Sequence, residues 1–430
     1  MAKPKSTSKK IFAPIKNYPI SKNRLMIIDF GSLAYHKLFA LISEKNKAYN
    51  NIDSAYLERI HWKANMLLEI LDTIQLFNPI DIIIALEGRN TWRHDVFIKY
   101  YKENHKITYD KTGYYIHHDN DITLIFKEND EFKFAKMKDK TNIPDKEILY
   151  DKLPEHIRKI VDVALPKYKG DRKKKPWDFK MTKGEFSDLR DSFAKDLAKI
   201  FRAKTVVVDN AEGDDIIYTT TVKLKDKYES MILISRDSDM NQLLNIKNFA
   251  IYNHLTKEMQ ECQNPEDYLN IKILSGDSSD SIPGIHIPGN RTKLGEAGAK
   301  TLYEGLSGES CYDRAKNDGW EKQYIRNRQL IDLSFCPTEI QENILNLIET
   351  ANPEFCPFWE LDVMELPEKL KTQIANMKMW GYYTLNTKEE IEKNSGNFNP
   401  QNLSQHKAKE EQSKVITRYG STEDYSGVFN

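Results

Sequence analysis

The sequence of 430 residues has few cysteines and lacks any long apolar run. A membrane-spanning helix needs about 20 apolar residues, and the N-terminus also lacks the apolar core of a signal peptide. Among the cysteines there is neither the spacing of a zinc site nor the density of a disulfide framework; they are Cys262, Cys311, Cys336 and Cys356. We therefore expect a soluble, cytoplasmic protein with reduced cysteines and no membrane partner.

The chain also lacks an excess of charge, because it has 64 basic and 64 acidic residues. A zero net charge argues against a protein that coats nucleic acid through bulk positive charge. Charge is segregated locally, however: residues 1–24 contain basic residues and no acid, and residues 388–430 are polar. This composition predicts a disordered basic arm and a disordered polar tail. No G-x-G-x-x-G follows the first expected strand, which disfavours a dinucleotide-binding enzyme.

Four short apolar runs are typical of buried parallel strands, and they end at Asp29, Glu87, Asp209 and Asp237. Helical spacing of apolar residues lies between them, over 57–77 and 215–224. Alternating strands and helices predict an α/β fold with a mostly parallel, doubly wound sheet. The stretch 91–202 is too long for a simple crossover, and within it residues 122–127 and 131–136 predict a β-hairpin. A later helix is expected over 339–350.

Acidic residues follow the expected strands at the ends where parallel strands open a crevice. Taken singly, each acid is also typical of a turn or a helix cap. Several carboxylates in one crevice would repel one another unless cations neutralised them. Oxygen ligands without His or Cys suit Mg²⁺, with Mn²⁺ as a substitute, and two such ions favour phosphodiester hydrolysis. The candidate ligands are Asp29, Glu87, Glu212, Asp214, Asp215, Asp237, Asp239, Asp277 and Asp280.

Five segments resemble, in order, the acidic motifs of the phage and bacterial 5′ nucleases: residues 26–35, 82–93, 206–217, 232–244 and 272–285. Residues 327–349 are similar to the C-terminal region of the T-even phage ribonuclease H, a flap endonuclease. This resemblance implies a PIN/5′-nuclease-like sheet and assigns the nine acids above as metal ligands or their water-mediated neighbours. It also implies that Asp29 and Glu87 are catalytic. The family generally has Asp where Glu87 stands, and the longer side chain would shift that metal site.

Two segments resemble the YKxxR element that follows the helical arch of the family. The first, 92–106, contains Arg93, Tyr101 and Lys102, of which the resemblance implies that Arg93 and Lys102 are catalytic. The second, 165–177, contains Tyr168, Lys169 and Arg172. Basic side chains bind phosphates and aromatic faces stack on bases. The alternative for 92–106 is an amphipathic helix with its aromatic residues in the core. The sequence does not rank the two segments.

Residues 281–304 resemble the helix-three-turn-helix with which the family holds duplex DNA. Glycines at a helix start expose backbone N–H groups to phosphate, so the candidate residues are Gly284, Gly298, Lys300 and Thr301. The spacing departs from the family pattern, because extra residues follow Gly284. A helix-turn-helix that never touches DNA is the alternative.

The expected domains are a basic arm over 1–24, a catalytic domain over 25–270 with an arch insertion at about 91–202, a C-terminal helical domain over 271–387, and a polar tail over 388–430. The resemblance implies a metal-dependent 5′-to-3′ exonuclease and flap endonuclease with ribonuclease H-type activity. Such an enzyme would remove RNA primers during DNA replication, in the host cytoplasm if phage-encoded.

The expected substrates are DNA with 5′ flaps, nicks or 5′ ends, and RNA:DNA hybrids. A single-strand-binding protein and a sliding clamp are the expected protein partners. Two alternatives stay open. A PIN-type ribonuclease would share the carboxylates but lack the arch and the helix-three-turn-helix. A catalytically degenerate nucleic-acid-binding protein would keep the fold, and the unusual Glu87 leaves room for it.

Overall fold

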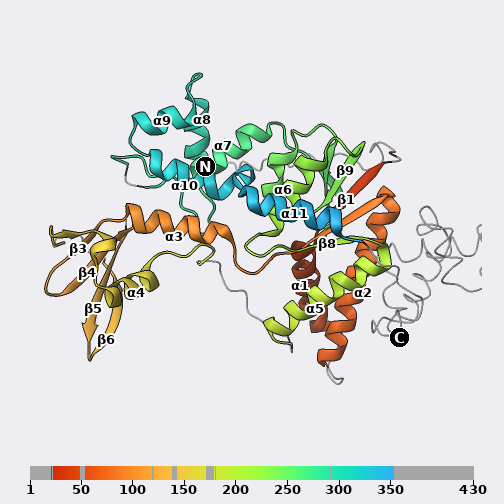
Figure 1. The fold of residues 1–430 in the computed structure, drawn as a ribbon, viewed down its shortest axis with the longest axis horizontal. Helices are drawn as coiled ribbons and strands as arrows, with labels where there is room; N and C mark the ends of the chain where they lie inside the picture. The colour runs from red at the N-terminus through yellow and green to blue at the C-terminus, as the bar shows by residue number, and fades with distance from the viewer. Residues whose placement is uncertain are drawn as a thin grey trace, which may run out of the picture. The chain divides into compact units, whose positions relative to one another are not determined.

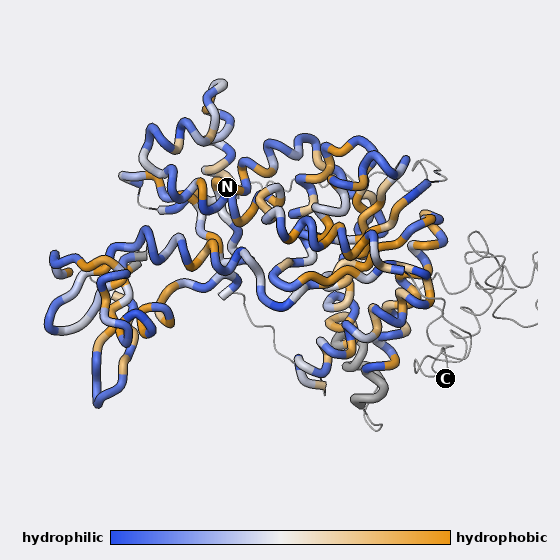
Figure 2. Tube along the Cα trace, in the orientation of Figure 1, coloured by the Kyte–Doolittle hydropathy of each residue, from blue (hydrophilic) through white to orange (hydrophobic). Residues whose placement is uncertain are grey.

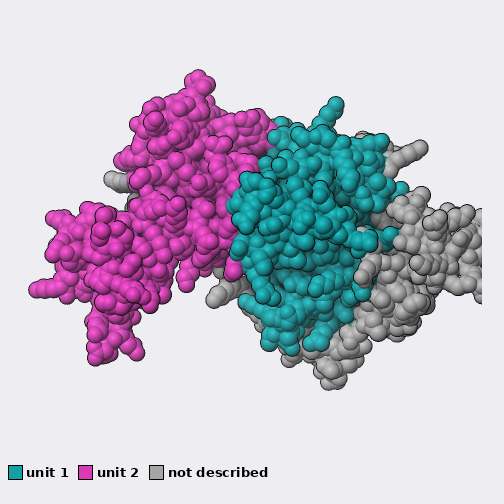
Figure 3. All heavy atoms as spheres, in the orientation of Figure 1, with its two compact units in different colours: residues 1–89, 175–263, 337–430 teal, residues 90–174, 264–336 magenta. Residues whose placement is uncertain are grey.

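The computed structural model describes residues 21, 23–48, 54–118, 121–137, 143–170, 179, 181–290 and 292–352. The chain forms two compact units (Figure 3). Unit 1 contains residues 1–89, 175–263 and 337–430, and unit 2 contains residues 90–174 and 264–336. These units follow a different division from the predicted domains, which stay predictions. The predicted basic arm, apart from its last residues, and the predicted polar tail lie outside the described residues.

Unit 1 is built on a six-stranded sheet with the order β11-β10-β9-β1-β2-β8, parallel except for the antiparallel edge strand β11. The strands are β1 (Arg24–Asp29), β2 (Asp81–Ala85), β8 (Lys204–Val206), β9 (Ser230–Ile234), β10 (Phe249–Asn253) and β11 (Glu258–Gln260). All four predicted strands are therefore confirmed. Three of them end two or three residues before the acid at which their apolar run stops, so those acids lie on loops at the carboxyl edge.

Helices cover both faces of this sheet (Figure 1). α1 (Phe30–Ala48), α2 (Ser54–Phe77) and α5 (Lys183–Phe201) pack on the face to which Met26, Ile28 and Ile84 point. α6 (Gly213–Leu224) and α11 (Thr338–Thr350) contact each other, β1, β2 and β8 on the other face. The doubly wound architecture is thus confirmed.

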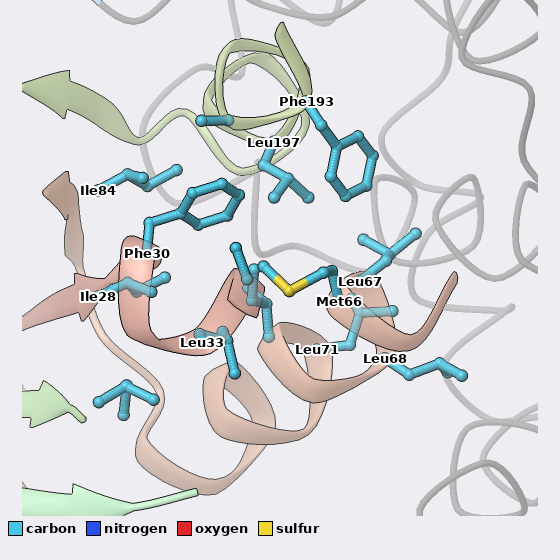
Figure 4. Close-up of a cluster of buried hydrophobic side chains, with 14 of the residues drawn as sticks. Ile28, Phe30, Leu33, Met66, Leu67, Leu68, Leu71, Ile84, Phe193 and Leu197 are labelled. Carbon is cyan, nitrogen blue, oxygen red and sulfur yellow. The ribbon is translucent and has the colours of Figure 1, made fainter. Parts of the chain in front are cut away.

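On the face that α1, α2 and α5 cover, strand residues and helix residues form one apolar cluster (Figure 4). Ile28 and Ile84 from the strands lie beside Phe30 and Leu33 of α1, Met66 and Leu67 of α2, and Phe193 and Leu197 of α5. Apolar residues fill the strands, while polar residues occupy the outer faces of the helices (Figure 2). Burial on both faces explains the continuous apolar runs of the parallel strands. No helix within the described ranges is long and apolar enough to cross a bilayer.

Unit 2 contains a five-stranded antiparallel sheet with the order β6-β5-β4-β3-β7. Its strands are β3 (Ile107–Tyr109), β4 (Gly113–His118), β5 (Asp121–Glu128), β6 (Glu131–Lys136) and β7 (Glu147–Ile148). Its helices are α3 (Trp92–Asn104), α4 (Glu155–Ala164), α7 (Pro265–Ser275), α8 (Glu296–Glu304), α9 (Cys311–Asn317) and α10 (Glu321–Ile331). Three short 3₁₀ turns complete the described elements: η2 (Tyr150–Lys152), η3 (Ser238–Leu243) and η4 (Leu333–Phe335).

The predicted hairpin is confirmed as β5 and β6, which are joined through Asn129 and Asp130 with positive φ. Three further strands of this sheet, β3, β4 and β7, were not predicted. β3 and β7 have only three and two residues and show no readable alternation. The insertion therefore contains a sheet besides helices α3 and α4. α5 differs as well, since it lies in the range expected for the insertion but belongs to unit 1.

Candidate metal and nucleic-acid sites

Asp29 is the last residue of β1 and its carboxylate is buried. The Ser32 N–H donates to Oδ1 at 3.1 Å, and the Ser235 hydroxyl donates to Oδ2 at 2.7 Å. Burial raises the pKa of Asp29 to about 6, and the charges of Asp237 and Glu87 add to the rise although both hydrogen bonds oppose it. Three carboxylates therefore interact electrostatically at the carboxyl edge of the sheet.

Asp237 and Asp239 follow β9 and are held by the start of η3. The Asp237 N–H donates to the Ser235 hydroxyl at 3.0 Å, and its carboxylate accepts from the Asp239 N–H at 2.9 Å. Met240 and Leu243 are buried and anchor the 3₁₀ turn in the core. A cavity of about 540 Å³ lies beside Asp237, lined also by Ser32, Arg236, Ser238, Asn253, Leu255 and Thr256.

Glu212, Asp214 and Asp215 open α6, as predicted. Glu212 and Asp215 form a capping box: the Asp215 carboxylate accepts from the Glu212 N–H at 2.9 Å, and the Glu212 side chain accepts from the backbone at Asp215. Negative side chains are favoured at a helix N-terminus. Glu212 and Asp215 are buried, and Asp214 is partly exposed in the first turn. Glu212 and Asp215 therefore act as helix caps, as the alternative interpretation states. Capping does not exclude that they also bind a metal ion.

Glu87 stands two residues beyond β2 and is exposed. The loop that carries it is fixed by Gly88, whose N–H donates to the Ala211 carbonyl at 3.0 Å. A Cβ on Gly88 would lie 1.8 Å from the Val208 oxygen, so this close approach requires glycine. Glu87 also acts on the buried guanidinium of Arg190, which donates to Asp191 at 2.7 Å. Sequence reasoning missed Arg190, because α5 gave no motif to mark it.

These carboxylates offer the oxygen donors that Mg²⁺ and Mn²⁺ prefer. With the side chains as they stand in the described part of the chain, no three His, Cys, Asp or Glu residues are grouped so that they could hold a metal ion. The fit is therefore one of donor type and charge: burial raises the pKa of Asp29, the charges of Asp237 and Glu87 add to the rise, and a bound cation would favour the charged carboxylate. Asp29 is the residue whose pKa is raised, and Asp237 and Glu87 are the two acids whose charges contribute to the rise.

The other two predicted metal ligands, Asp277 and Asp280, belong to unit 2. Lys272 lies 3.0 Å from the Asp277 carboxylate, and although burial raises the pKa of Asp277, Lys272 and Ser279 hold it below its usual value. The Asp280 carboxylate accepts from the Tyr168 hydroxyl at 2.9 Å and lies 3.8 Å from the Lys169 ammonium. Their role as metal ligands stays a prediction.

The predicted substrate residues of α3 are partly enclosed in the core of unit 2. Arg93 is 1% exposed, donates to the Leu330 carbonyl at 3.1 Å and stacks on Trp92. Tyr101 is 3% exposed and packs against Phe97. These positions match the alternative of an amphipathic helix with buried aromatic residues. The proposed contacts of Arg93 and Tyr101 with a substrate stay predictions and would require both side chains to move.

Lys102 and Lys169, the lysines of the two YKxxR-like elements, are partly exposed. Lys102 lies 3.1 Å from Asp162; partial burial opposes its charged form, but Tyr150 and Asp162 raise its pKa. Lys169 has a positive φ of 59° and its N–H donates to the Asp280 carbonyl at 2.8 Å. Arg172 lies outside the described residues.

The predicted helix-three-turn-helix, residues 281–304, follows α7 in the chain and ends with α8. Gly284 is buried, and a Cβ there would lie 2.1 Å from the Leu294 oxygen and 2.6 Å from the Ser275 oxygen. The sequence prediction gave Gly284 a close approach to phosphate, but in the free protein the close approach is to this chain's own backbone. Gly298 is exposed in α8. Lys300 and Thr301 lie in the second turn of α8.

Comparison with known proteins bears on the part of the chain that carries most of these acids. Residues 133–270 match the family described as 5′-3′ exonuclease, N-terminal resolvase-like domain. The chain is 38% identical over 98 residues to a 5′-3′ exonuclease of Buchnera aphidicola subsp. Schizaphis graminum. The matched residues make up 21% of this chain and 34% of the relative. By sequence, residues 133–270 are therefore similar to the N-terminal domain of 5′-3′ exonucleases. The matched segment includes Glu212 to Asp239.

A second 5′-3′ exonuclease, from Mycoplasmopsis pulmonis, is 26% identical over 166 residues, covering 33% of this chain and 54% of the relative. The chain thus spans about a third to a half of the length of these relatives. A solved structure of a bacteriophage T5 flap endonuclease with DNA and metal ions is 13% identical and covers 76% of this chain and 98% of its own, with a TM-score of 0.41. The expected likeness to T-even phage ribonuclease H in particular stays a prediction.

Proposed function

We propose that this chain is a divalent-metal-dependent 5′ nuclease that hydrolyses phosphodiesters near 5′ ends. The observation that carries the proposal is that Asp29, Glu87 and Asp237 stand at or just beyond the carboxyl ends of β1, β2 and β9 in the parallel sheet. The match of residues 133–270 to the 5′-3′ exonuclease N-terminal domain supports the same proposal. A structural explanation alone would not require three acids at the one edge where α/β folds bind their ligands.

In this proposal the residues of unit 1 hold the cations. Asp29, Asp237 and Asp239 bind them at the carboxyl edge, with Glu87, Glu212, Asp214 and Asp215 as further ligands or as acceptors for metal-bound water. Two divalent cations, Mg²⁺ or Mn²⁺, would supply an activated water and stabilise the leaving oxygen. Ser235 orients Asp29 and Asp237 through its single hydroxyl. Asp277 and Asp280 are proposed to complete the set of acids.

The proposed substrates are DNA with 5′ flaps, nicks or free 5′ ends, and RNA:DNA hybrids. Lys102 and Lys169 are proposed to bind the phosphates of the strand to be cut, since each presents an ammonium group that is at least partly exposed. Removal of RNA primers during replication would follow from these activities. A single-strand-binding protein and a sliding clamp are the proposed partners.

The test compares Asp239→Asn with the wild type on a 5′-flap, a nicked duplex, an RNA:DNA hybrid and single-stranded RNA, with Mg²⁺ and then with EDTA. Asp239 is chosen because Asp237 also caps η3, so a change there would disturb the fold. Asp226→Asn, at an exposed position beyond α6, is the matched control. Cleavage of the flap that requires Mg²⁺, is lost in Asp239→Asn and survives in Asp226→Asn would support the proposal.

Other outcomes would replace it. Cleavage of single-stranded RNA without cleavage of the flap would favour a PIN-type ribonuclease. Tight binding of every substrate without cleavage, under any metal, would favour a catalytically degenerate binding protein. Full activity of Asp239→Asn would place the chemistry elsewhere.

A further inference from the structure

A cavity of about 440 Å³ opens in unit 2 between α3 and α10. α3 contributes Val96, Lys99, Tyr100, Glu103 and Asn104, and α10 contributes Lys322, Ile325, Arg326 and Gln329. None of the nine predicted metal ligands lines it.

Arg326 is the unusual member of this cavity, because it is a guanidinium with 1% exposure. Its Nε donates to Asn327 at 2.9 Å, its Nη2 donates to the Pro283 carbonyl at 3.2 Å, and its plane lies over the Tyr100 ring at 4.5 Å. Nη1 is buried without a hydrogen-bond partner among the described residues. Within the same residues, no carboxylate lies at ion-pair distance from Arg326.

A buried guanidinium with an unmet donor is costly, and an anion that binds only the folded protein would offset the cost. The rim of the cavity has the matching charge. Lys99 and Lys322 are exposed there, and the single acid, Glu103, lies 3.9 Å from Lys99 in an exposed pair that contributes little. The cavity residues therefore carry three positive charges and one negative charge.

We propose that this cavity binds a phosphate group of a nucleic-acid strand. The proposal rests on the proposed function in one respect, namely that the chain handles nucleic acid. Lys99 and Lys322 make the first contacts, and the phosphate reaches Nη1 after a movement of the side chains around Arg326, since Nη1 is closed to water in the free protein. Val96 and the half-exposed Ile325 offer apolar contact to the adjoining sugar or base, which a free phosphate would not use.

The test neutralises the rim in the double variant Lys99→Gln/Lys322→Gln and compares it with Lys159→Gln/Lys316→Gln. The control removes two exposed lysines of the same unit, on α4 and α9, that do not line the cavity. Binding of a fluorescent 5′-flap DNA is measured in EDTA at several salt concentrations, so that cleavage plays no part. The rim variant is expected to bind several-fold more weakly, with a salt slope smaller by about one phosphate contact, while the control keeps the wild-type slope.

Adding inorganic phosphate distinguishes a free anion from a phosphate group of a nucleic-acid strand. If it raises the melting temperature of the wild type but not of Arg326→Gln, and the DNA salt slopes are equal in both double variants, the cavity takes a free anion and the proposal is overturned. Equal slopes without any effect of phosphate would make Arg326 a purely structural residue and overturn it too. The salt slopes and melting temperatures do not depend on catalysis. A wild type that binds DNA but never cleaves it would therefore contradict the nuclease proposal, while the phosphate-binding proposal could still be tested.

Discussion

The Ser235 hydroxyl donates a hydrogen bond to the Asp29 carboxylate at 2.7 Å and accepts one from the Asp237 N–H at 3.0 Å. Ser235 is completely buried, so no water substitutes for either contact. One side chain thus joins the carboxyl ends of β1 and β9 and sets the positions of two acids that repel each other.

Replacing Ser235 by Ala should lower the free energy of unfolding by about 1–2 kcal/mol, because both hydrogen bonds are lost. The pKa of Asp29 should rise further, since the Ser235 hydrogen bond lowers it. Less of Asp29 is then charged at a given pH, so the pH–rate profile of metal-dependent cleavage should shift to higher pH. The measurements are urea unfolding and cleavage rates between pH 5 and pH 9.

Ser230→Ala is the matched control, because it removes a buried hydroxyl at the opposite end of β9 that accepts from Arg24 at 3.2 Å. Its stability should fall similarly without a change in the pH–rate profile. Identical profiles for both variants would show that Ser235 does not act through the carboxylates.

The sheet and its acids were accessible to sequence reasoning because their signals are local. Continuous apolar runs mark strands buried on both faces, and an acid after such a run must lie near the carboxyl edge. Asp29 and Asp237 were found in this way. Ser235 was not, because a serine inside an apolar run has no distinguishing pattern. Arg190 was missed because nothing in the sequence of α5 marks it.

The parts that escaped prediction depend on contacts between residues distant in sequence. Arg93 belongs to a basic, aromatic helix, yet it is buried because its guanidinium meets the Leu330 carbonyl. Gly284 looked like a phosphate contact, yet its lack of a side chain is required by Leu294. A short strand such as β7 forms only because β3 lies beside it.

The two YKxxR-like segments should differ in their effect on catalysis. Lys169→Ala combined with Arg172→Ala is expected to reduce kcat on a 5′-flap far more than Lys102→Ala. The reason is that Lys169 lies 3.8 Å from Asp280, a proposed metal ligand, whereas Lys102 is paired with Asp162, which is not one. Tyr168→Phe, which removes only the hydroxyl that donates to Asp280, shows how much of the loss arises from Asp280 itself. A larger loss in Lys102→Ala would assign the element to residues 92–106.

The stability of the protein should depend on His254 below neutral pH. Its Nε2 lies 3.1 Å from Nδ1 of His36, and burial lowers the pKa of His254 to about 3, with Glu69 opposing the shift and His36, Lys37 and Lys257 adding to it. The unfolded chain therefore binds a proton that the folded chain does not. The contribution is fully present above pH 6.5, the unfolded value, and is lost as the pH falls from there towards 3.

His254→Gln removes this dependence. Relative to the variant, the wild type should lose about 1.4 kcal/mol of unfolding free energy per pH unit below 6.5, measured by urea unfolding at pH 7.5, 6 and 5. His94→Gln, at an exposed position, should follow the wild type throughout. Parallel curves for His254→Gln and the wild type would contradict the assignment.

The last prediction separates the two glycines of the helix-three-turn-helix segment. Gly284→Ala should destabilise the protein by about 1–3 kcal/mol, because the new Cβ would lie 2.1 Å from the Leu294 oxygen and backbone must shift. Gly298→Ala should be neutral or slightly stabilising, since its Cβ meets only the flexible Leu294 side chain at 3.2 Å and Ala favours a helix. Melting temperatures of the two variants check this contrast.

If Gly298 faces duplex phosphate, a substitution at Gly298 should impair the use of double-stranded substrates selectively, although it has the smaller effect on stability. Gly298→Val places a branched side chain on the exposed start of α8, so it should raise KM on double-stranded substrates while slow cleavage of single strands is retained. Lys300→Ala, which removes an exposed charge 3.7 Å from Glu304, should weaken binding modestly and reduce the salt slope by up to about one phosphate contact. Gly284→Ala should instead lower both activities together, in step with its melting temperature. Equal losses on both substrates in Gly298→Val, at an unchanged melting temperature, would show that α8 does not select duplex.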